Sequence, residues 1–460
     1  MRGGASWKAS GATTCTSSRI RNSAISCGPV ARPCSPRCRG SNQARNACVP
    51  PNCYSPINFI PNRSPEPGRG RIDMSETTGK SGLRKDRLDH LISVMEDDIA
   101  RGKYHGGVVC IGRHGEIGLH AAVGHGYRDR RTPLTTEHVF SLFSLTKALT
   151  NVLVLRAIER GELAFNTRIS AVIPEFSGGL RETLTVYHLM THQTGIPPLF
   201  MLKPGMYIDR LDEIIAAICE VVQVTDTPGV KVDYSPMVAH ALLGEMASRV
   251  DPGRRRYRQL IEDEIFKPLR MQDSAIGVRR DLKARKIVPD FLSVMPMVHP
   301  GHGNLGTHGA FEEEDAEMPW VGGISTAHDI YRFAEMLRRG GELDGARVIG
   351  PVILDQATRN RTGDKPNELY KTLALSRGWP PCPAYIGLGF SLRGEAICQH
   401  QFGTLTSPRT FGNHGAGSTL FWVDPALDMS FICLTAGVMD EGDNIMRFQR
   451  LSDIAASAAV

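Results

Sequence analysis

The stretch FSLFSLTKALTNVLVL, Phe140 to Leu155, places a serine and a lysine three residues apart at the start of an otherwise apolar helix. Side chains at i and i+3 lie on one face of a helix, so Ser144 and Lys147 are neighbours. Apolar residues such as Leu149 and Val152 predict that the helix is buried. Burial lowers the pKa of a lysine, and a neutral amine can accept a hydroxyl proton. The pattern therefore indicates a serine nucleophile; a helix cap beside a snorkelling lysine is the structural alternative.

A tyrosine and a glycine-rich strand supply further candidate residues. In PGVKVDYSPMVAHALLGEMASRV, we expect Ser235 to cap a helix that begins at Pro236, which would hold the Tyr234 phenol at a rigid helix start. Such a phenol can relay a proton, although an ordinary buried tyrosine fits as well. In FGNHGAGSTLFWVDP, small residues let backbone N–H groups approach a ligand. We expect the N–H groups of Ser144 and Ala416 to form an oxyanion hole.

The flanking segments predict the fold. GGVVCIGRHGEIGLH is typical of a hairpin that turns at 113–115, and STLFWVDPALDMSFICLTAGV of one that turns at 424–428. Strands near both ends of a helical middle predict an α+β fold, in which N- and C-terminal strands form one antiparallel sheet flanked by helices, with a mostly helical lobe inserted. Periodicity predicts helices at 144–160, 185–192, 211–224, 237–250 and 443–459.

Six segments, in order from about Arg84 to the C-terminus, resemble the successive motifs of the beta-lactamase-related serine hydrolases. This group includes class C beta-lactamases, D-alanyl-D-alanine carboxypeptidases, family VIII esterases and fungal transesterases. The resemblance implies Ser144 as nucleophile, Lys147 as base and Tyr234 as the group that shuttles the proton to the leaving group and activates the deacylating water. It also implies a two-lobed fold with a cleft between the lobes. The matching segments are FSLFSLTKALTNVLVLRAIERGEL, LTVYHLMTHQTGIP, PGVKVDYSPMVAHALLGEMASRV, IFKPLRMQDS, VGGISTAHDIYRFAEMLRRGGEL and FGNHGAGSTLFWVDP.

The chain departs from this family pattern at two places. Where many relatives have Tyr-x-Asn, Pro236 stands two residues after Tyr234, so the amide contact of that asparagine is missing. Where relatives have Lys-Thr-Gly or His-x-Gly, the substrate-binding positions are Asn413, His414 and Gly415. Without a strand cation to bind a carboxylate, neutral esters are favoured over lactams and peptides.

These observations predict a cofactor-free serine hydrolase, a carboxylesterase that acts through an acyl-Ser144 intermediate on a small-molecule ester or amide. The alternatives are a transesterase, a beta-lactamase or D-Ala-D-Ala peptidase with the same site, and a non-catalytic binding protein on this fold. His188 and His192 have the spacing of the two histidines of a helical zinc motif, but Leu189 stands where that motif has a glutamate after the first histidine. No metal site is therefore expected. We expect the loops 199–207 and 294–320 to shape the pocket; the oligomeric state stays open.

Residues 1–73 differ in composition from the rest of the chain. They hold 11 basic and 2 acidic residues, which gives this segment a charge of +9. Because the whole chain has a charge of +6, the remainder has a charge of −3. A mildly acidic body excludes a nucleic-acid footprint. The segment fits a disordered tail, an organellar transit peptide or sequence upstream of a true start at Met74; we favour the last, with residues 74–460 as the hydrolase domain.

Cysteine usage and hydropathy give an expectation for the compartment. Five cysteines after residue 73 are scattered through apolar stretches, and we expect them to be unpaired, as in a reducing compartment. No run of eighteen apolar residues occurs, so no membrane span is expected. The prediction is a cytoplasmic protein, or an organellar one if residues 1–73 are a transit peptide.

Overall fold

A computed structural model describes residues 78–127, 129–287 and 311–460. All of them belong to one compact unit, which spans Gly70–Val460. The predictions for residues 1–73 lie outside the described residues.

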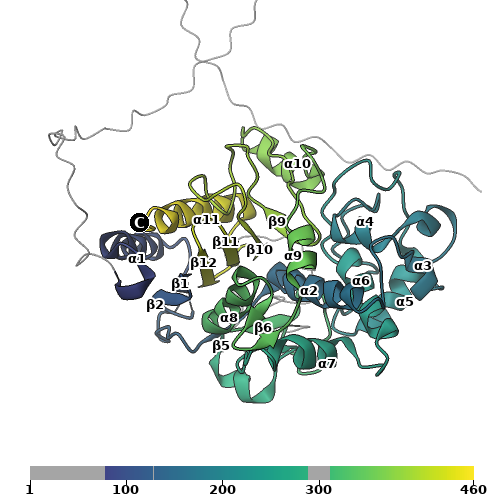
Figure 1. The fold of residues 1–460 in the computed structure, drawn as a ribbon, viewed down its shortest axis with the longest axis horizontal. Coiled ribbons are helices and arrows are strands. Elements are labelled where there is room, and N and C mark those ends of the chain that lie inside the picture. The colour runs from purple at the N-terminus through teal and green to yellow at the C-terminus, as the bar shows by residue number, and fades with distance from the viewer. Residues whose placement is uncertain (1–77, 128, 288–310) are drawn as a thin grey trace, which may run out of the picture. The chain divides into compact units, whose positions relative to one another are not determined.

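A six-stranded antiparallel sheet joins the two ends of this unit, in the order β2-β1-β12-β11-β10-β9. β1 pairs with β12 from Gly106 opposite Ala436 to Arg113 opposite Met429, so an N-terminal hairpin continues directly into a C-terminal one (Figure 1). This confirms the predicted sheet and both hairpins. The strands are β1 (Gly106–Arg113), β2 (Glu116–Gly124), β9 (Ser391–Leu392), β10 (Phe411–Gly415), β11 (Thr419–Asp424) and β12 (Met429–Ala436).

Helices cover both faces of the sheet. Because side chains alternate along a strand, Val108 and Cys110 of β1 face one apolar cluster, while Val109 and Ile111 face another. α1 and α11 pack together over the second cluster, and α8 lies against β1, β11 and β12 on the other face (Figure 1). These helices are α1 (Lys85–Ala100), α8 (Ala327–Arg338) and α11 (Glu441–Ala456).

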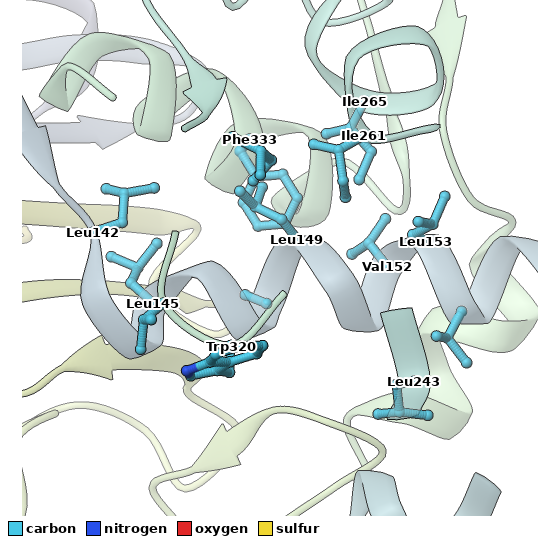
Figure 2. Packing of buried hydrophobic residues seen from close by; sticks show 14 of the residues in the cluster. Leu142, Leu145, Leu149, Val152, Leu153, Leu243, Ile261, Ile265, Trp320 and Phe333 are labelled. Carbon is cyan, nitrogen blue, oxygen red and sulfur yellow. The ribbon is translucent and has the colours of Figure 1, made fainter. Parts of the chain in front are cut away.

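The helix that carries the candidate lysine, α2 (Thr146–Glu159), runs through the middle of the core. Its buried residues face all directions, as expected for a helix enclosed by protein. Figure 2 shows Leu149 of α2 beside Phe333 of α8, with Val152 and Leu153 nearby. The serine–lysine pair therefore stands at the end of a rigid, enclosed element.

The inserted lobe is mostly helical, as predicted, and two small sheets accompany it. Its α4, α5 and α6 lie within the predicted helices but begin or end one to three residues inside them. The remaining α-helices of the described chain are α3 (Ile169–Val172), α4 (Val186–Met190), α5 (Leu211–Val221), α6 (Val238–Val250), α7 (Tyr257–Ile261), α9 (Pro351–Ala357) and α10 (Glu368–Ser376). The small sheets contain β3 (Val139–Ser141), β4 (Ala275–Ile276), β5 (Lys286–Ile287) and β6 (Gly323–Ser325), and β7 (Glu342–Leu343) with β8 (Ala346–Arg347).

The prediction of unpaired cysteines is wrong for two of the five. Cys382 and Cys398 form a disulfide, whereas Cys110, Cys219 and Cys433 are free. The paired cysteines lie in the largely irregular segment between α10 and β10, where sequence periodicity gives no indication of which residues meet. Because Cys382 and Cys398 are paired, they do not support the expected reducing compartment.

The sequence also predicted that the chain has no membrane span. Among the residues that the structure describes, no helix is both long and apolar enough to cross a bilayer.

Candidate active site

Ser144 lies in a tight turn between a strand and a helix. β3 ends at Ser141, a 3-10 turn covers Phe143–Leu145, and α2 follows at once. Phe143 has a φ of 51°, which is uncommon for a residue with a side chain, and its ring packs on that of Phe311 with centroids 5.3 Å apart. This strained turn presents the serine at the head of α2, because the surrounding core holds Phe143 in place.

Lys147 is buried one turn further on, with 2% of its surface exposed. Its Nζ lies 3.1 Å from Oγ of Ser144, 2.9 Å from the carbonyl oxygen of Pro236 and 3.0 Å from that of Trp320. A neutral amine has two hydrogens and one lone pair. The two carbonyls can accept the hydrogens, so the lone pair is left to face the serine hydroxyl.

Burial lowers the pKa of Lys147 well below its usual 10.5. No carboxylate is within salt-bridge distance of it in the described parts of the chain, so no ion pair there offsets the cost of burying the charge. The amine therefore releases its proton more readily than a surface lysine does.

Tyr234 completes a cluster of three side chains. Its hydroxyl lies 2.8 Å from Oγ of Ser144, and Nζ of Lys147 lies 5.1 Å from the centroid of its ring. Burial raises the pKa of Tyr234, although the bond to Ser144 opposes the change. The phenol therefore keeps its proton and can donate a hydrogen bond to the serine oxygen.

The local structure before α6 differs from the prediction in detail. α6 begins at Val238, so Pro236 is not its first residue and Ser235 is not its cap. Oγ of Ser235 still accepts the backbone N–H of Ala239 at 3.0 Å. The two residues before the helix instead turn the Pro236 carbonyl toward Lys147, which propensity rules for helix starts do not anticipate.

His192 packs against the tyrosine, whereas His188 lies elsewhere. The His192 and Tyr234 ring centroids are 5.0 Å apart, and Nδ1 of His192 accepts the backbone N–H of Ser235 at 3.1 Å. Burial, and then the charge of Lys147, lower the pKa of His192 to about 3. Nδ1 of His188 is bonded to Thr185. Across residues 78–127, 129–287 and 311–460, no His, Cys, Asp and Glu side chains group to hold a metal ion.

Strand β10 lies against the turn that carries Ser144. A Cβ added to Gly415 would lie 2.3 Å from the carbonyl oxygen of Leu142, and Oγ1 of Thr419 donates to that same oxygen at 2.7 Å. Only glycine permits this approach. Ala416 follows Gly415 directly, so the two expected oxyanion donors, on Ala416 and Ser144, belong to segments in contact.

The other two substrate-binding candidates line the cavity beside the serine. Nδ2 of Asn413 donates to the carbonyl oxygen of Gly389 at 3.4 Å, and its Oδ1 is buried with no partner among the described residues. Nδ2 of Asn151 in α2 donates to the same Gly389 carbonyl at 2.7 Å. Asn413 therefore has a free acceptor, whereas Gly415 serves packing and does not line the cavity.

His414 contacts two residues that sequence reasoning missed. Its Nε2 lies 2.7 Å from Oε1 of Glu441 and 3.1 Å from the hydroxyl of Tyr370. Burial raises the pKa of Glu441, but His414 and the N–H of Gly417 lower it more, so the net shift is downward. A charge on His414 would thus be paired with a carboxylate.

A cavity of about 110 Å³ opens over the cluster. Ser144, Lys147 and Tyr234 lie on one side, and most of the wall comes from the segment 367–401, including Trp379 and Phe390. No residue of the loop 199–207 lines it, so that prediction is wrong; most of the loop 294–320 lies outside the described residues. Amphipathic patterns do not reveal such a wall, since irregular segments are placed only by tertiary packing.

Residues 91–456 match the family described as Beta-lactamase. The chain belongs to the beta-lactamase family. This family comprises serine hydrolases, esterases among them, so the resemblance seen in the motifs is confirmed.

Individual members of the beta-lactamase family resemble this chain in different parts. Esterase EstB of Burkholderia gladioli is 33% identical over 129 residues, which cover 27% of this chain and about a third (32%) of EstB. Esterase/beta-lactamase LipL of Mycobacterium tuberculosis is 24% identical over 336 residues, 67% of this chain and 72% of LipL. The solved structure of a family VIII carboxylesterase superposes with a TM-score of 0.68 at 21% identity, over 81% of this chain and 97% of that one. That likeness shows a shared fold.

Proposed function

We propose that the protein is a cofactor-free carboxylesterase that acts through an acyl-Ser144 intermediate. The observation that carries the proposal is the joint position of two groups at one hydroxyl. Oγ of Ser144 has the Lys147 amine at 3.1 Å and the Tyr234 phenol at 2.8 Å, at the mouth of a cavity. A nucleophile, its base and an acid within hydrogen-bond reach are what acyl transfer requires.

In the acylation step, neutral Lys147 takes the Ser144 proton as the serine oxygen attacks the ester carbonyl. The lowered pKa of Lys147 supports this role, since a larger share of the amine is neutral near pH 7. Tyr234, whose raised pKa keeps it protonated, gives its proton to the leaving alcohol and recovers one from the lysine. In the deacylation step, water attacks the acyl-serine and the same proton transfers run in the reverse direction.

The backbone N–H groups of Ser144 and Ala416 stabilise the tetrahedral oxyanion in this proposal. The contact of Gly415 with Leu142 supports it, because it fixes the strand end against the serine turn. Donors held in place before the reaction contribute the largest share of stabilisation in many acyl-transfer enzymes.

The substrate is a neutral ester with a compact acyl group. A cavity of about 110 Å³ is small beside the ~300–1,000 Å³ that drug-sized ligands occupy. Four basic side chains line it among the described residues: burial lowers the pKa of His192 and of His400 to about 3, which keeps them neutral, His414 contacts Glu441, and Lys147 has no carboxylate partner there. A carboxylate on the substrate would thus find no cation except the base itself, which disfavours lactams and peptides.

The proposal is tested by comparing the turnover of p-nitrophenyl acetate with that of a cephalosporin, using wild-type protein and the Ser144→Ala variant. The expected result is ester hydrolysis that requires Ser144 and exceeds cephalosporin hydrolysis in kcat/KM. Faster cephalosporin cleavage would favour the lactamase alternative. Ester products carrying an added alcohol acceptor, in place of water, would favour the transesterase.

A further inference from the structure

Glu441, the first residue of α11, makes hydrogen bonds to three separate segments around the candidate site. Its Oε1 lies 2.7 Å from Nε2 of His414 in β10 and 3.3 Å from the hydroxyl of Tyr370 in α10. Its Oε2 accepts the backbone N–H of Gly417 at 3.0 Å. One carboxylate therefore connects the strand, the cavity wall and the turn that follows the strand.

Gly417 lies in the turn 416–418, directly after the expected oxyanion donor. The N–H that Glu441 accepts belongs to the peptide between Ala416 and Gly417. Holding that peptide restrains ψ of Ala416, one of the two torsions that connect it to the Gly415–Ala416 peptide, which carries the Ala416 N–H. The carbonyl oxygen of Gly415, on the same peptide as that N–H, accepts the N–H of Ser418 at 3.2 Å. Gly417 has a φ of 68°, and an added Cβ would lie 2.5 Å from Cγ1 of Val438 and 2.6 Å from the carbonyl oxygen of Met439, so the turn has little room to move.

The other side of Gly417 is held as well. Its carbonyl oxygen accepts the N–H of Met439 at 3.1 Å and Nη2 of Arg447 at 3.4 Å. Arg447 is 3% exposed, and its Nη1 donates to Oγ1 of Thr435 at 3.0 Å. Glu441 is thus one of several groups that hold this turn, and it also contacts His414 and Tyr370, which line the cavity.

We propose that Glu441 is a positioning residue that aims the Ala416 N–H at the oxyanion by holding the Ala416–Gly417 peptide. This rests on the proposed function, in which Ala416 is an oxyanion donor. His414 and Tyr370 contact the other oxygen of the carboxylate, which keeps Glu441 in the orientation that meets Gly417.

A carboxylate suits this place because it can accept from all three partners, namely the Gly417 N–H, the Tyr370 hydroxyl and Nε2 of His414 in the form that carries a proton there. A glutamine at position 441 has one oxygen and an NH₂ group, and that NH₂ would face either the Gly417 N–H or the Nε2–H of His414. With the proton of His414 on Nε2, Glu441→Gln therefore keeps the size of the side chain but leaves one of these contacts as donor against donor; only a shift of that proton to Nδ1 would restore both contacts. The turn loses its fixed direction while Ser144, Lys147 and Tyr234 are untouched.

The test compares Glu441→Gln with wild type and with Glu368→Gln, a control on α10 whose side chain pairs with Lys371 at the surface. The measurements are kcat and KM for a p-nitrophenyl ester and the affinity of phenylboronic acid, which forms a tetrahedral adduct with the serine. We expect Glu441→Gln to lower kcat 10- to 100-fold and boronate affinity by a similar factor, with KM within threefold, because a misaimed donor weakens tetrahedral species selectively. The control should match wild type.

A purely structural role would move melting temperature and KM without selective loss of boronate affinity, and that pattern would overturn the proposal, as would a kcat within twofold of wild type. Should Glu441→Gln not fold, Glu441→Asp replaces it: its shorter carboxylate cannot span His414 and Gly417 together, so a kcat loss of at least threefold is expected and an unchanged kcat overturns the inference. Absence of any esterase activity in wild type would instead defeat the proposed function, and this inference with it.

Discussion

Lys147 directs its nitrogen at the hydroxyl of Ser144 from 3.1 Å while two backbone carbonyls are placed to accept its hydrogens. The pair is therefore arranged for a proton to move from oxygen to nitrogen. The same burial that makes a charged lysine costly makes the neutral amine available.

The pH dependence of kcat/KM follows from this burial. The base must be neutral, and the pKa of Lys147 is lowered well below 10.5, so the rate should rise with pH through one ionisation whose midpoint lies below 10.5. The raised pKa of Tyr234 predicts no falling limb below pH 10. A pH–rate profile checks both limbs. Lys147→Arg, which stays charged, should lower kcat at least about 1,000-fold at every pH; a rate that falls as pH rises from 6 to 9 would contradict the assignment.

Removing the Tyr234 hydroxyl should impair the transfer of the proton to the leaving group. Tyr234→Phe is expected to lower kcat about 100- to 1,000-fold, the range typical of a lost general acid. Tyr187→Phe is the matched control, because its hydroxyl bonds to the carbonyl of Arg361 and Tyr187 does not line the cavity. Steady-state kinetics on both variants measure this difference. Equal losses of kcat in the two variants would mean that the effect is not specific to the Tyr234 hydroxyl.

The close approach of β10 to the serine turn makes Gly415 intolerant of a side chain. Gly415→Ala would place a Cβ 2.3 Å from the carbonyl oxygen of Leu142 and should reduce kcat at least about tenfold as the strand shifts. In Gly253→Ala the nearest atom would be a side-chain oxygen of Asp251 at 3.1 Å, and little change is expected. Activity and melting temperature are measured for both; full activity in Gly415→Ala would show that the contact is not needed.

The disulfide closes part of the cavity wall. Cys382 lines the cavity, and the bond to Cys398 closes a loop with a sequence separation of 16, so its removal should cost about 3 kcal/mol of unfolding free energy. We expect the Cys382→Ser, Cys398→Ser double variant to raise KM, since the wall loosens, while labelling of Ser144 continues. Cys219→Ser, at a free half-buried cysteine, is the control. Urea denaturation and ester kinetics test this; an unchanged unfolding midpoint would contradict it.

A cluster of guanidinium groups around Glu264 predicts acid lability. Burial raises the pKa of Glu264, but contacts with Arg160, Arg156 and Arg255 lower it more, to about 2, from the usual 4.5. A lowered carboxyl pKa stabilises the fold fully above about pH 4.5, by on the order of 3 kcal/mol, and this is lost as pH falls toward 2. The stability gap between wild type and Glu264→Gln, measured by urea denaturation, should therefore shrink from pH 5 to pH 2. A gap independent of pH would contradict the prediction.

Local patterns predicted what depends on local geometry. The spacing of Ser144 and Lys147, followed by an apolar helix, was enough to bring the hydroxyl and amine together, because i and i+3 share a face whatever the rest of the chain does. The two terminal hairpins were likewise visible from their turns. The starts of α2 and α6 shifted where a 3-10 turn or the non-helical Pro236 preceded the helix, and α5 and α11 ended three residues before their predicted ends.

Contacts between distant segments could not be predicted in this way. Glu441 meets Tyr370 across 71 positions only because α10 and α11 dock beside β10. Cys382 and Cys398 meet within a segment that has almost no periodic structure. The contact between Tyr234 and Ser144 was predicted only from the resemblance to known motifs, because no spacing rule connects residues 90 positions apart.

The most direct test of the account is the reaction of folded wild-type protein with a fluorophosphonate, followed by mass spectrometry of the digested peptides. The account predicts one adduct per chain, on Ser144, which forms faster as pH rises and is abolished in Lys147→Arg. An unmodified Ser144 in folded protein, under conditions that label a known serine hydrolase, would contradict it.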